Sequence, residues 1–221
     1  GDKTCSATLD EALACDIVTL HVPLIQDGEY KTLHLIDEQN LLKLKPNAIF
    51  INASRGNVVD NEALSEFLEK RSDIKVWLDV FEGEPEINCK KLLSQVDGAT
   101  AHIAGYSYES KRRANVMLAF TLAKVLKLEE PKAYVMPKPE IESTTLGKVE
   151  NLDLDLIRRL VFSVYDVRRD SLMFKNCFKN AKSFDAMRSN YRERRELSSL
   201  HLLNVEDKFK EQLSLLGFSV D

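Results

Sequence analysis

Four short apolar runs, separated by amphipathic segments, constrain the fold of this chain more than any other feature of its sequence. They are nearly continuous in apolar and β-branched residues, which is typical of strands buried on both faces of a parallel sheet. The runs are DIVTLHV (16–22), AIFINA (48–53), KVWLDVF (75–81) and GATAHIA (98–104). Because parallel neighbours require crossover connections, the segments between the runs should be helical.

Segments with helical spacing do lie between and after these runs. We expect helices at 37–45, 61–71, 88–96 and 109–128. Asp37 precedes the first helix and Asp60 or Asn61 the second, and short polar side chains at such positions serve as N-caps. Strands that alternate with helices predict an α/β layer fold for residues 1–130.

A cluster of prolines marks the end of this first part. Pro131, Pro137 and Pro139 are three of the six prolines in the chain, and they indicate a linker at 131–139. Beyond the linker we expect helices at 154–167, 183–197 and 206–217 and strands at 199–205 and 218–221. Residues 140–221 are therefore predicted to form a second, smaller α/β domain.

The composition argues against several classes of protein. The 221 residues are 44% hydrophobic with a net charge of −4, which suits a sizeable core and gives no overall basis for binding nucleic acid or an anionic membrane. No apolar run approaches the roughly 18 residues of a membrane-spanning helix, and the polar start has no signal-peptide core. Four cysteines without C-x-x-C spacing indicate reduced thiols. We expect a cytoplasmic protein without a metal site.

Functional side chains follow the ends of the predicted strands. In open α/β sheets, ligands bind outside the carboxyl ends of the strands. The second run ends at Arg55, the third continues from Asp79 to Glu84, and the fourth contains His102. Convergence of these strand ends would place Arg55, Glu84 and His102 around one cleft.

These three residue types suit one reaction. The arginine fork binds a carboxylate in bidentate fashion, and a histidine takes a proton from a hydroxyl and returns it. A glutamate that is hydrogen-bonded to the imidazole fixes its tautomer and favours the imidazolium. A carboxylate clamp with a His–Glu proton relay is what the oxidation of a 2-hydroxy acid requires, and the hydride would then need a nicotinamide as acceptor.

Each residue also has a structural interpretation. A histidine after a strand is more often a satisfied structural residue, Asp79 could cap a helix, and Arg55 could pair with a surface carboxylate. The G-x-G-x-x-G fingerprint of dinucleotide-binding folds does not occur among the eight glycines. The residue pattern alone therefore leaves both interpretations open.

Longer motifs resemble a known family. The stretches INASRGNVVDNEAL (51–64), LDVFEGEP (78–85) and AHIAGYS (101–107), in this order and spacing, are similar to cofactor-domain signatures of the D-isomer-specific 2-hydroxyacid dehydrogenases. PLIQDGEYKTLHLID (23–37) and FDAMRSNYRERRELSSL (184–200) resemble one branch of that family, which acts on a phosphorylated hydroxy acid and carries a C-terminal dimerisation domain. The resemblance implies a partial Rossmann-like, doubly wound parallel sheet followed by a small α/β dimerisation domain.

The resemblance also implies roles for individual residues. Arg55 matches the substrate-carboxylate arginine, His102 the catalytic base and Glu84 its partner. Tyr106 matches a substrate-contacting tyrosine. The implied cofactor is NAD, contacted by Val22, Ala53, Ser54, Arg55, Asp79 and Gly105. At Val22 the branch can carry a threonine, so the valine keeps backbone contacts only.

Two further expectations concern the extent and assembly of the protein. The Gly-rich loop and the acidic residue that reads the adenosine ribose would precede residue 1, so the preference for NAD over NADP rests on the family alone. The helix at 154–167 carries a broad apolar surface, from which we predict a homodimer built mainly through 140–221. The competing account is that this surface packs against the first domain of the same chain.

Arginines are concentrated in the last third of the chain. Eight of the twelve lie between 158 and 195 and are interleaved with Asp and Glu, which favours a salt-bridged, solvated helix face. The alternative is a rim that attracts phosphate. Nucleic-acid binding is not expected, because no stacking aromatic residues are interspersed with the arginines.

Three functions stay open at this stage. The first is an NAD-dependent dehydrogenase of a small phosphorylated hydroxy acid. The second is a dehydrogenase of another 2-hydroxy acid, such as 3-phosphoglycerate. The third is a non-catalytic, partial chain that folds and dimerises without binding cofactor.

Overall fold

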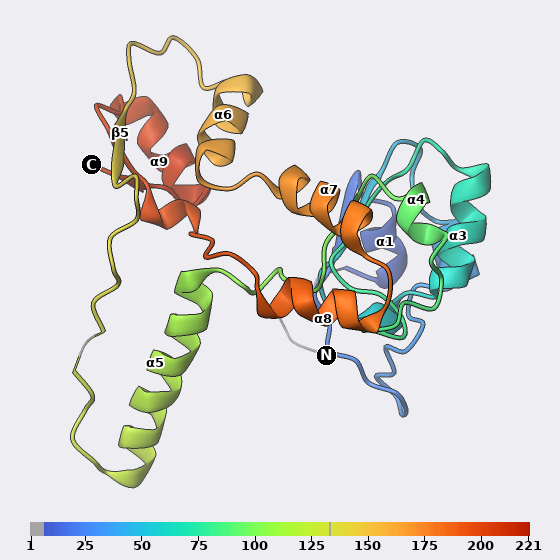
Figure 1. Cartoon of the computed structure of the whole chain (residues 1–221). Coiled ribbons are helices and arrows are strands. Elements are labelled where there is room, and N and C mark those ends of the chain that lie inside the picture. Colours follow the sequence, from blue (N-terminus) through green and yellow to red (C-terminus); the bar gives the residue numbers. More distant parts are fainter. Residues whose placement is uncertain (1–6, 133) are drawn as a thin grey trace. The chain divides into compact units, whose positions relative to one another are not determined.

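The computed structural model describes residues 7–132 and 134–221, and these fall into two compact units (Figure 1). The first unit comprises residues up to Ala104 together with Arg168–Tyr191. The second comprises Gly105–Val167 and Arg192–Asp221. This division differs from the predicted one, in which a single linker at 131–139 separates the domains.

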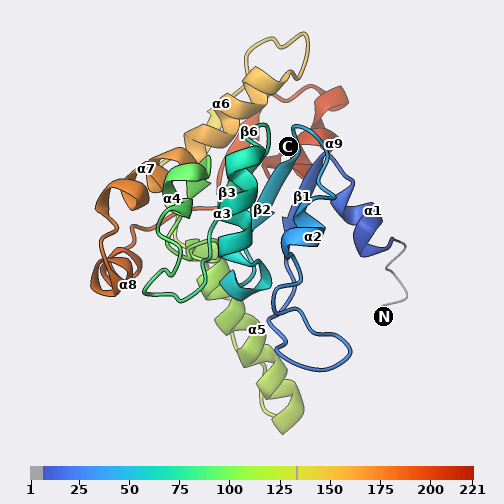
Figure 2. The same ribbon diagram turned by 90° about the vertical axis from the view of Figure 1, so that its right-hand side faces the viewer.

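A four-stranded parallel sheet forms the centre of the first unit (Figure 2). Its strands lie in chain order: β1 (Ile17–Leu20), β2 (Ile49–Asn52), β3 (Lys75–Leu78) and β4 (Gly98–Ala99). Each lies within one of the four apolar runs, so the predicted α/β fold with parallel strands is confirmed. Because all four strands point the same way, their carboxyl ends meet at one edge of the sheet.

Helices cover this sheet. They are α1 (Leu9–Leu13), α2 (Glu38–Leu41), α3 (Asn61–Lys70), α4 (Leu92–Gln95), α7 (Val167–Cys177) and α8 (Ala181–Ser189). Asp37 and Asp60 are the predicted N-caps: each accepts a backbone hydrogen bond at 2.9 Å, from Asn40 and Ala63 respectively. The core contains apolar residues of both strands and helices, such as Phe50 and Leu64, which have no exposed surface.

Two of the helices predicted between the strands of the first sheet, at 37–45 and 88–96, are much shorter than expected. The helix predicted at 37–45 ends at Leu41, before Pro46, which lacks a backbone donor. In the region predicted at 88–96, the chain first forms successive i→i+3 bonds, from Leu92 N to Cys89 O and from Leu93 N to Lys90 O. Regular helix therefore begins only at Leu92.

Helices α7 and α8 belong to the first unit, although both lie beyond the predicted linker. Phe174 and Phe184 are almost fully buried, and the Phe174 ring lies 5.8 Å from the rings of both Phe81 and Phe184. Ser171 Oγ accepts a hydrogen bond of 3.0 Å from Ala99 N, at the sheet's edge strand. This aromatic cluster, formed by residues far apart in sequence, is the physical reason why residues 168–191 group with the first unit and not with the second.

The second unit is a small α/β fold with its own core. Its helices are α5 (Tyr108–Leu126), α6 (Leu154–Val164) and α9 (Asp207–Leu215). Its three-stranded parallel sheet has the order β5 (Ser143–Thr145), β6 (His201–Leu203), β7 (Ser219–Val220). The strands within 199–205 and 218–221 and the helices at 109–128, 154–167 and 206–217 are confirmed, whereas β5 was not predicted. The helix expected at 183–197 ends at Ser189, where Asn190 is the C-cap.

The apolar surface of α6 is largely covered within this unit. Leu160 is 7% exposed, and Leu156, Val161 and Val164 pack around the same core, whereas Leu154 stays exposed. The exposed apolar surface of α6, from which the dimer interface was predicted, is therefore smaller than the sequence suggested. Among the described residues, Cys15, Cys89 and Cys177 are free thiols, and Cys5 lies outside the described part.

Candidate active site

His102 and Glu84 form a hydrogen-bonded pair beyond the carboxyl ends of β3 and β4. Glu84 Oε2 lies 2.8 Å from His102 Nδ1, and the two side chains are 16% and 31% exposed. The other carboxylate oxygen of Glu84 accepts a hydrogen bond of 2.6 Å from Phe81 N. Both ends of the pair are thus anchored, and solvent can still reach the imidazole.

Asp79 holds the backbone turn that presents His102. Its carboxylate accepts hydrogen bonds from Thr100 Oγ1 at 2.5 Å and from Ile103 N and Ala104 N at 2.8 Å each. His102 N donates to Asp79 O at 2.8 Å. His102 itself has φ 54°, a left-handed conformation that is uncommon outside glycine. The hydrogen bonds of Asp79 are what stabilise this turn.

Burial has a clear electrostatic consequence at Asp79. The residue is only 7% exposed. Loss of solvent raises the pKa of the Asp79 carboxyl above its usual range, although the hydrogen bonds from Thr100, Ile103 and Ala104 act in the opposite direction. The residue pattern did not reveal this structural role, because two of the three donors are backbone N–H groups, which leave no signature in a sequence.

Arg55 lies at the carboxyl end of β2, where Asn52 shapes the turn. Asn52 is fully buried; its Oδ1 accepts from Ser54 N at 3.0 Å and from Ser54 Oγ at 2.8 Å, and its Nδ2 donates to Arg55 O at 3.0 Å. Arg55 is exposed, and its Nη1 donates to Ser54 O at 2.7 Å. Asn52 was not among the predicted site residues, yet it fixes the backbone from which the guanidinium extends.

A close backbone approach connects the ends of β2 and β3. A Cβ atom on Gly56 would lie 2.0 Å from the carbonyl carbon and oxygen of Phe81, so only glycine fits there. β2 and β3 are neighbouring strands of the sheet. Arg55 and Glu84 therefore follow the carboxyl ends of two neighbouring strands.

The remaining predicted site residues divide between the two units. Val22 is half-buried and packs against the first unit's core, and Ala53 lies between β2 and Ser54. Gly105 and Tyr106 belong to the second unit, where Lys111 Nζ lies 4.1 Å from the centre of the Tyr106 ring. The contacts predicted for these residues with cofactor or substrate stay predictions.

A second histidine–carboxylate contact lies in the same unit and was not predicted. His34 Nε2 lies 2.6 Å from Glu82 Oε1, and His34 Nδ1 lies 3.6 Å from Asp60 Oδ2. Glu82 Oε2 also accepts from Asn61 N at 3.0 Å. These bonds connect the 23–36 segment to the start of α3. The His34–Glu82 pair resembles the His102–Glu84 pair in its residue types, but its contacts serve the fold.

Residues 7–132 and 134–221 form neither a candidate metal site nor a membrane-spanning helix. In this part of the chain, no three His, Cys, Asp or Glu residues are grouped so that they could hold a metal ion. None of the helices formed by these residues is long and apolar enough to cross a membrane.

The comparison with known proteins agrees with this geometry. Residues 2–104 match the family described as D-isomer specific 2-hydroxyacid dehydrogenase, NAD binding domain, and residues 135–217 match a domain of unknown function, DUF3410. The erythronate-4-phosphate dehydrogenases of Escherichia fergusonii and Escherichia coli K12 are each 44% identical to the chain over 222 residues. Residues 2–104 are thus similar to the NAD-binding domain of the D-isomer specific 2-hydroxyacid dehydrogenases, and almost the whole chain is similar to erythronate-4-phosphate dehydrogenases. The resemblance stated for residues 51–107 is thereby confirmed.

The curated relatives are longer than the region that this chain matches. The alignments cover 99% of this chain but 58% of the length of the two relatives. Among solved structures, a D-lactate dehydrogenase with NAD+ from Lactobacillus jensenii is 30% identical over 56% of this chain and 41% of its own, with a TM-score of 0.47.

The two matched families correspond only partly to the two units. The match to the NAD-binding domain ends at residue 104, where the first segment of the first unit also ends. The match to the domain of unknown function includes residues 168–191, which pack on the first unit. In this chain, the C-terminal region therefore supplies two helices, α7 and α8, to the unit whose sheet carries the candidate site.

Proposed function

We propose that this chain is part of an NAD-dependent dehydrogenase that oxidises 4-phospho-D-erythronate. The product would be the 2-oxo acid, 3-hydroxy-2-oxo-4-phosphooxybutanoate, formed in the synthesis of pyridoxal 5′-phosphate. The observation that carries the proposal is the 2.8 Å contact between Glu84 and His102 at the end of a parallel sheet. Support comes from the 44% identity with erythronate-4-phosphate dehydrogenases along almost the whole chain.

In the proposed reaction, His102 is the general base. Its Nδ1 faces the Glu84 carboxylate, which is an acceptor only, so Nδ1 carries the proton and Nε2 offers its lone pair to the substrate hydroxyl. As the 2-hydroxyl proton moves to Nε2, the ring becomes an imidazolium. The adjacent carboxylate stabilises that charge.

Arg55 is proposed to bind and orient the substrate carboxylate. A guanidinium remains charged at every relevant pH and forms two parallel hydrogen bonds to a carboxylate. Arg55 is exposed at the end of β2, next to the strand that leads to Glu84. Clamping the carboxylate would fix the position of the neighbouring 2-hydroxyl relative to the base.

The residues present fit the nicotinamide end of NAD. They lie at the carboxyl ends of parallel strands, where open α/β sheets bind their ligands. Val22, Ala53, Ser54, Asp79 and Gly105 would hold that end of the cofactor. When bound, NAD would supply the acceptor for the hydride of the 2-hydroxy acid.

The test uses the product of the whole gene that contains this sequence, because the chain spans 58% of the length of its curated relatives. NADH formation would be followed with 4-phospho-D-erythronate, and with 3-phosphoglycerate as the competing substrate. We expect the larger kcat/KM for 4-phospho-D-erythronate and a severe loss of turnover in His102→Ala.

Two outcomes would replace the proposal. A larger kcat/KM for 3-phosphoglycerate would assign the enzyme to another 2-hydroxy acid. Absence of NADH formation with both acids, together with absence of NAD binding in calorimetry, would favour the non-catalytic alternative.

A further inference from the structure

Asn61 is a buried residue whose side chain connects two segments beyond the carboxyl ends of the first sheet. It is 1% exposed and begins α3. Its Nδ2 donates to Val59 O at 2.9 Å, in the segment that follows β2, and its Oδ1 accepts from Glu82 N at 3.1 Å, in the segment that follows β3. One short side chain therefore joins the segment that carries Arg55 to the segment that carries Glu84.

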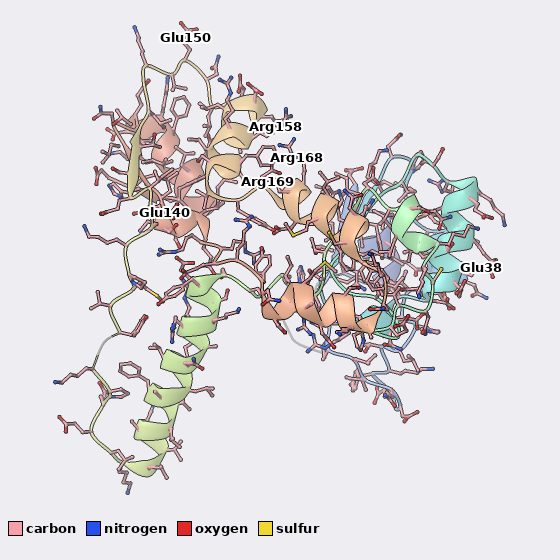
Figure 3. The ribbon with its side chains drawn as sticks, in the orientation of Figure 1. Glu38, Glu140, Glu150, Arg158, Arg168 and Arg169 are labelled. Atoms are coloured by element: carbon pink, nitrogen blue, oxygen red, sulfur yellow. The ribbon has the colours of Figure 1, made fainter. Side chains whose placement is uncertain are left out.

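The helix itself does not require an asparagine at this position. The sequence predicts Asp60 or Asn61 as the N-cap of α3, and the structure gives that role to Asp60, whose carboxylate accepts from Ala63 N. Glu38 occupies the corresponding first position of α2, after the N-cap Asp37, and it is exposed (Figure 3). The burial of Asn61 therefore reflects its bonds to the two segments and not the start of a helix.

Asn61 and Glu82 bind each other reciprocally. In addition to the bond from Glu82 N to Asn61 Oδ1, Asn61 N donates to Glu82 Oε2 at 3.0 Å. The carbonyl of Glu82 accepts from Asn88 N at 3.1 Å. The backbone N–H of Glu82 thus depends on the amide of Asn61 and not on its own carboxylate. Glu82→Gln would keep both bonds to Asn61, since an amide oxygen can accept in place of the carboxylate oxygen.

The peptide unit between Phe81 and Glu82 is held on both sides. Its N–H donates to Asn61 Oδ1, and its carbonyl lies where a Cβ atom on Gly56 would come within 2.0 Å. Both neighbours follow β2 in the chain. Rotation of this peptide unit would break the bond to Asn61 or press the carbonyl against the backbone of Gly56.

The carboxylate of Glu84 depends on the same stretch of backbone. Its Oε1 accepts from Phe81 N at 2.6 Å, and its Oε2 faces His102 Nδ1 at 2.8 Å. Phe81 N and Glu82 N belong to consecutive peptide units, so a displacement at Glu82 moves the group that anchors Glu84. In catalysis, misplacement of a reacting group by about 1 Å can cost roughly 100-fold in rate.

We propose that Asn61 is a positioning residue for the Glu84–His102 pair. It acts through the backbone of residues 81 and 82 and holds the carboxylate of Glu84 against the imidazole. An asparagine suits this role because its amide combines one donor group with one acceptor, whereas an ionised aspartate lacks the donor for Val59 O. The inference rests on the proposed function, in which Glu84 and His102 form the proton relay.

The test compares Asn61→Leu with wild type in the product of the whole gene. Leucine has a similar volume but neither donor nor acceptor, so Val59 O and Glu82 N lose their partner. We expect kcat to fall about tenfold or more, because Glu84 no longer holds His102 in place. The KM for 4-phospho-D-erythronate should stay within about threefold of wild type, because Arg55 is unchanged.

A spectroscopic measurement tests the same inference without turnover. A ring N–H that donates to a carboxylate exchanges slowly with water and gives a downfield proton signal in NMR spectra. The Nδ1–H of His102 should give this signal at low temperature in the absence of NAD and substrate, and His102→Ala identifies the signal by its loss. In Asn61→Leu the signal should be lost, or shifted toward that of an imidazole in water.

Two further variants complete the test. Ser65→Ala is the matched control on the same helix: Ser65 is 3% exposed, and its Oγ donates to Gln95 Oε1 of α4 at 2.6 Å. It removes a buried hydrogen bond of α3 and should leave both kcat and the Nδ1–H signal unchanged. Asn61→Ala removes the same two bonds as Asn61→Leu but leaves room for water, so it replaces the leucine variant if that variant does not fold.

Three results would overturn the inference, with circular dichroism verifying that each variant is folded. An unchanged Nδ1–H signal in Asn61→Leu or Asn61→Ala would leave Asn61 with a purely structural role. Equal loss of the signal in Ser65→Ala would indicate general loosening of α3. Absence of the signal from wild type would contradict the Glu84–His102 contact itself. A wild-type protein that shows the signal but forms no NADH would refute the proposed function and not the role of Asn61.

Discussion

Asp79 is the single residue on which the position of His102 most depends. Asp79→Asn would keep an acceptor for Thr100 and Ile103 but turn an amide donor toward Ala104 N, which donates at 2.8 Å in the native protein. One bond would be lost and two donors would face each other in a buried place. We expect the free energy of unfolding to fall by about 1–3 kcal/mol, measured by urea denaturation.

A substitution that removes only one hydrogen bond provides the control for Asp79→Asn. Thr100→Val removes only the hydroxyl that donates to Asp79 and should cost less than Asp79→Asn. In the whole gene product, Asp79→Asn should also lower kcat, because the turn that carries His102 shifts. Unfolding curves of Asp79→Asn that coincide with wild type would contradict the role given to Asp79.

The glutamate next to His102 can be tested against a near-identical glutamate in the same loop. Glu84→Gln keeps the shape of the side chain but removes the charge that stabilises the imidazolium, so kcat should fall by roughly 100-fold. Glu82→Gln changes a carboxylate that contacts His34 at 2.6 Å and should leave kcat within about threefold of wild type. Equal effects of both substitutions on steady-state rates would refute the assignment of the relay to Glu84.

Arg55 can be compared with another arginine of the first unit. Arg55→Lys preserves the charge but cannot reproduce a planar, two-bond grip on a carboxylate, so kcat/KM should fall severely. Arg71 binds Asp73 through Nε at 2.8 Å and Nη2 at 2.9 Å and precedes the amino end of β3, whereas Arg55 follows the carboxyl end of β2. Arg71→Lys should leave kcat/KM unchanged. A near-wild-type rate in Arg55→Lys would refute the proposal that Arg55 binds the substrate carboxylate.

The sequence indicates the residues proposed for catalysis more clearly than the residues that position them. Arg55, Glu84 and His102 were recognisable because each combines a functional side chain with a strand end. Asn52 and Asp79 position those residues mainly through hydrogen bonds to backbone groups. Such bonds depend on the path of the main chain, which is not encoded in any short motif.

At the scale of secondary structure, a carboxylate fastens the start of α5 to the 192–196 segment. Glu196 accepts hydrogen bonds of 2.7 Å from both Ser107 Oγ and Ser110 Oγ. Burial alone would raise the pKa of Glu196, but these hydroxyls and the charges of Arg113 and Arg194 outweigh it and lower the pKa below its usual value. The ionised form is therefore the one that the folded state favours.

This shift predicts how the second unit responds to acid. Because the folded pKa of Glu196 is depressed, its contribution to stability is present above the ordinary glutamate value of 4.5 and is lost as the pH falls through the folded value. Glu196→Gln should lower stability at pH 7 and flatten its loss below pH 4.5, measured by urea denaturation. Glu211→Gln, at an exposed position of α9, should retain the wild-type slope, and an unchanged slope in Glu196→Gln would contradict the prediction.

Elements were predictable where local periodicity and burial agree. The strands β1, β2 and β3 each bury every second residue within an apolar run, and α3 has both its cap and its apolar strip in sequence. By contrast, the sequence of α7, VRRDSLMFKNC, gives little indication of its position, which depends on the contact of Phe174 with Phe81. The polar strand β5 is held by parallel pairing with β6. Both depend on partners that are distant in the chain.

At the scale of the whole molecule, several of the exposed large apolar side chains among the described residues lie on α5. Leu118, Leu122 and Val125 are 68%, 57% and 71% exposed, and their spacing places them on one face of the helix. A second exposed set includes Met117 and Leu126, at 63% and 55%. Contiguous apolar surface of this kind marks an interaction site, so the interface of the predicted homodimer is better sought on α5 than on α6.

We expect this chain to be a homodimer whose two-fold interface includes α5. A two-fold axis lets one apolar face cover its own copy. Sedimentation equilibrium at micromolar concentration should give twice the 25.2 kDa of the chain. Leu122→Glu places a charge within the exposed face of α5 and should yield monomers, whereas Leu154→Glu, at a 78% exposed position of α6, should stay dimeric. The reverse pattern would return the interface to residues 140–221 as first predicted, and a wild-type mass near 25.2 kDa would contradict the dimer itself.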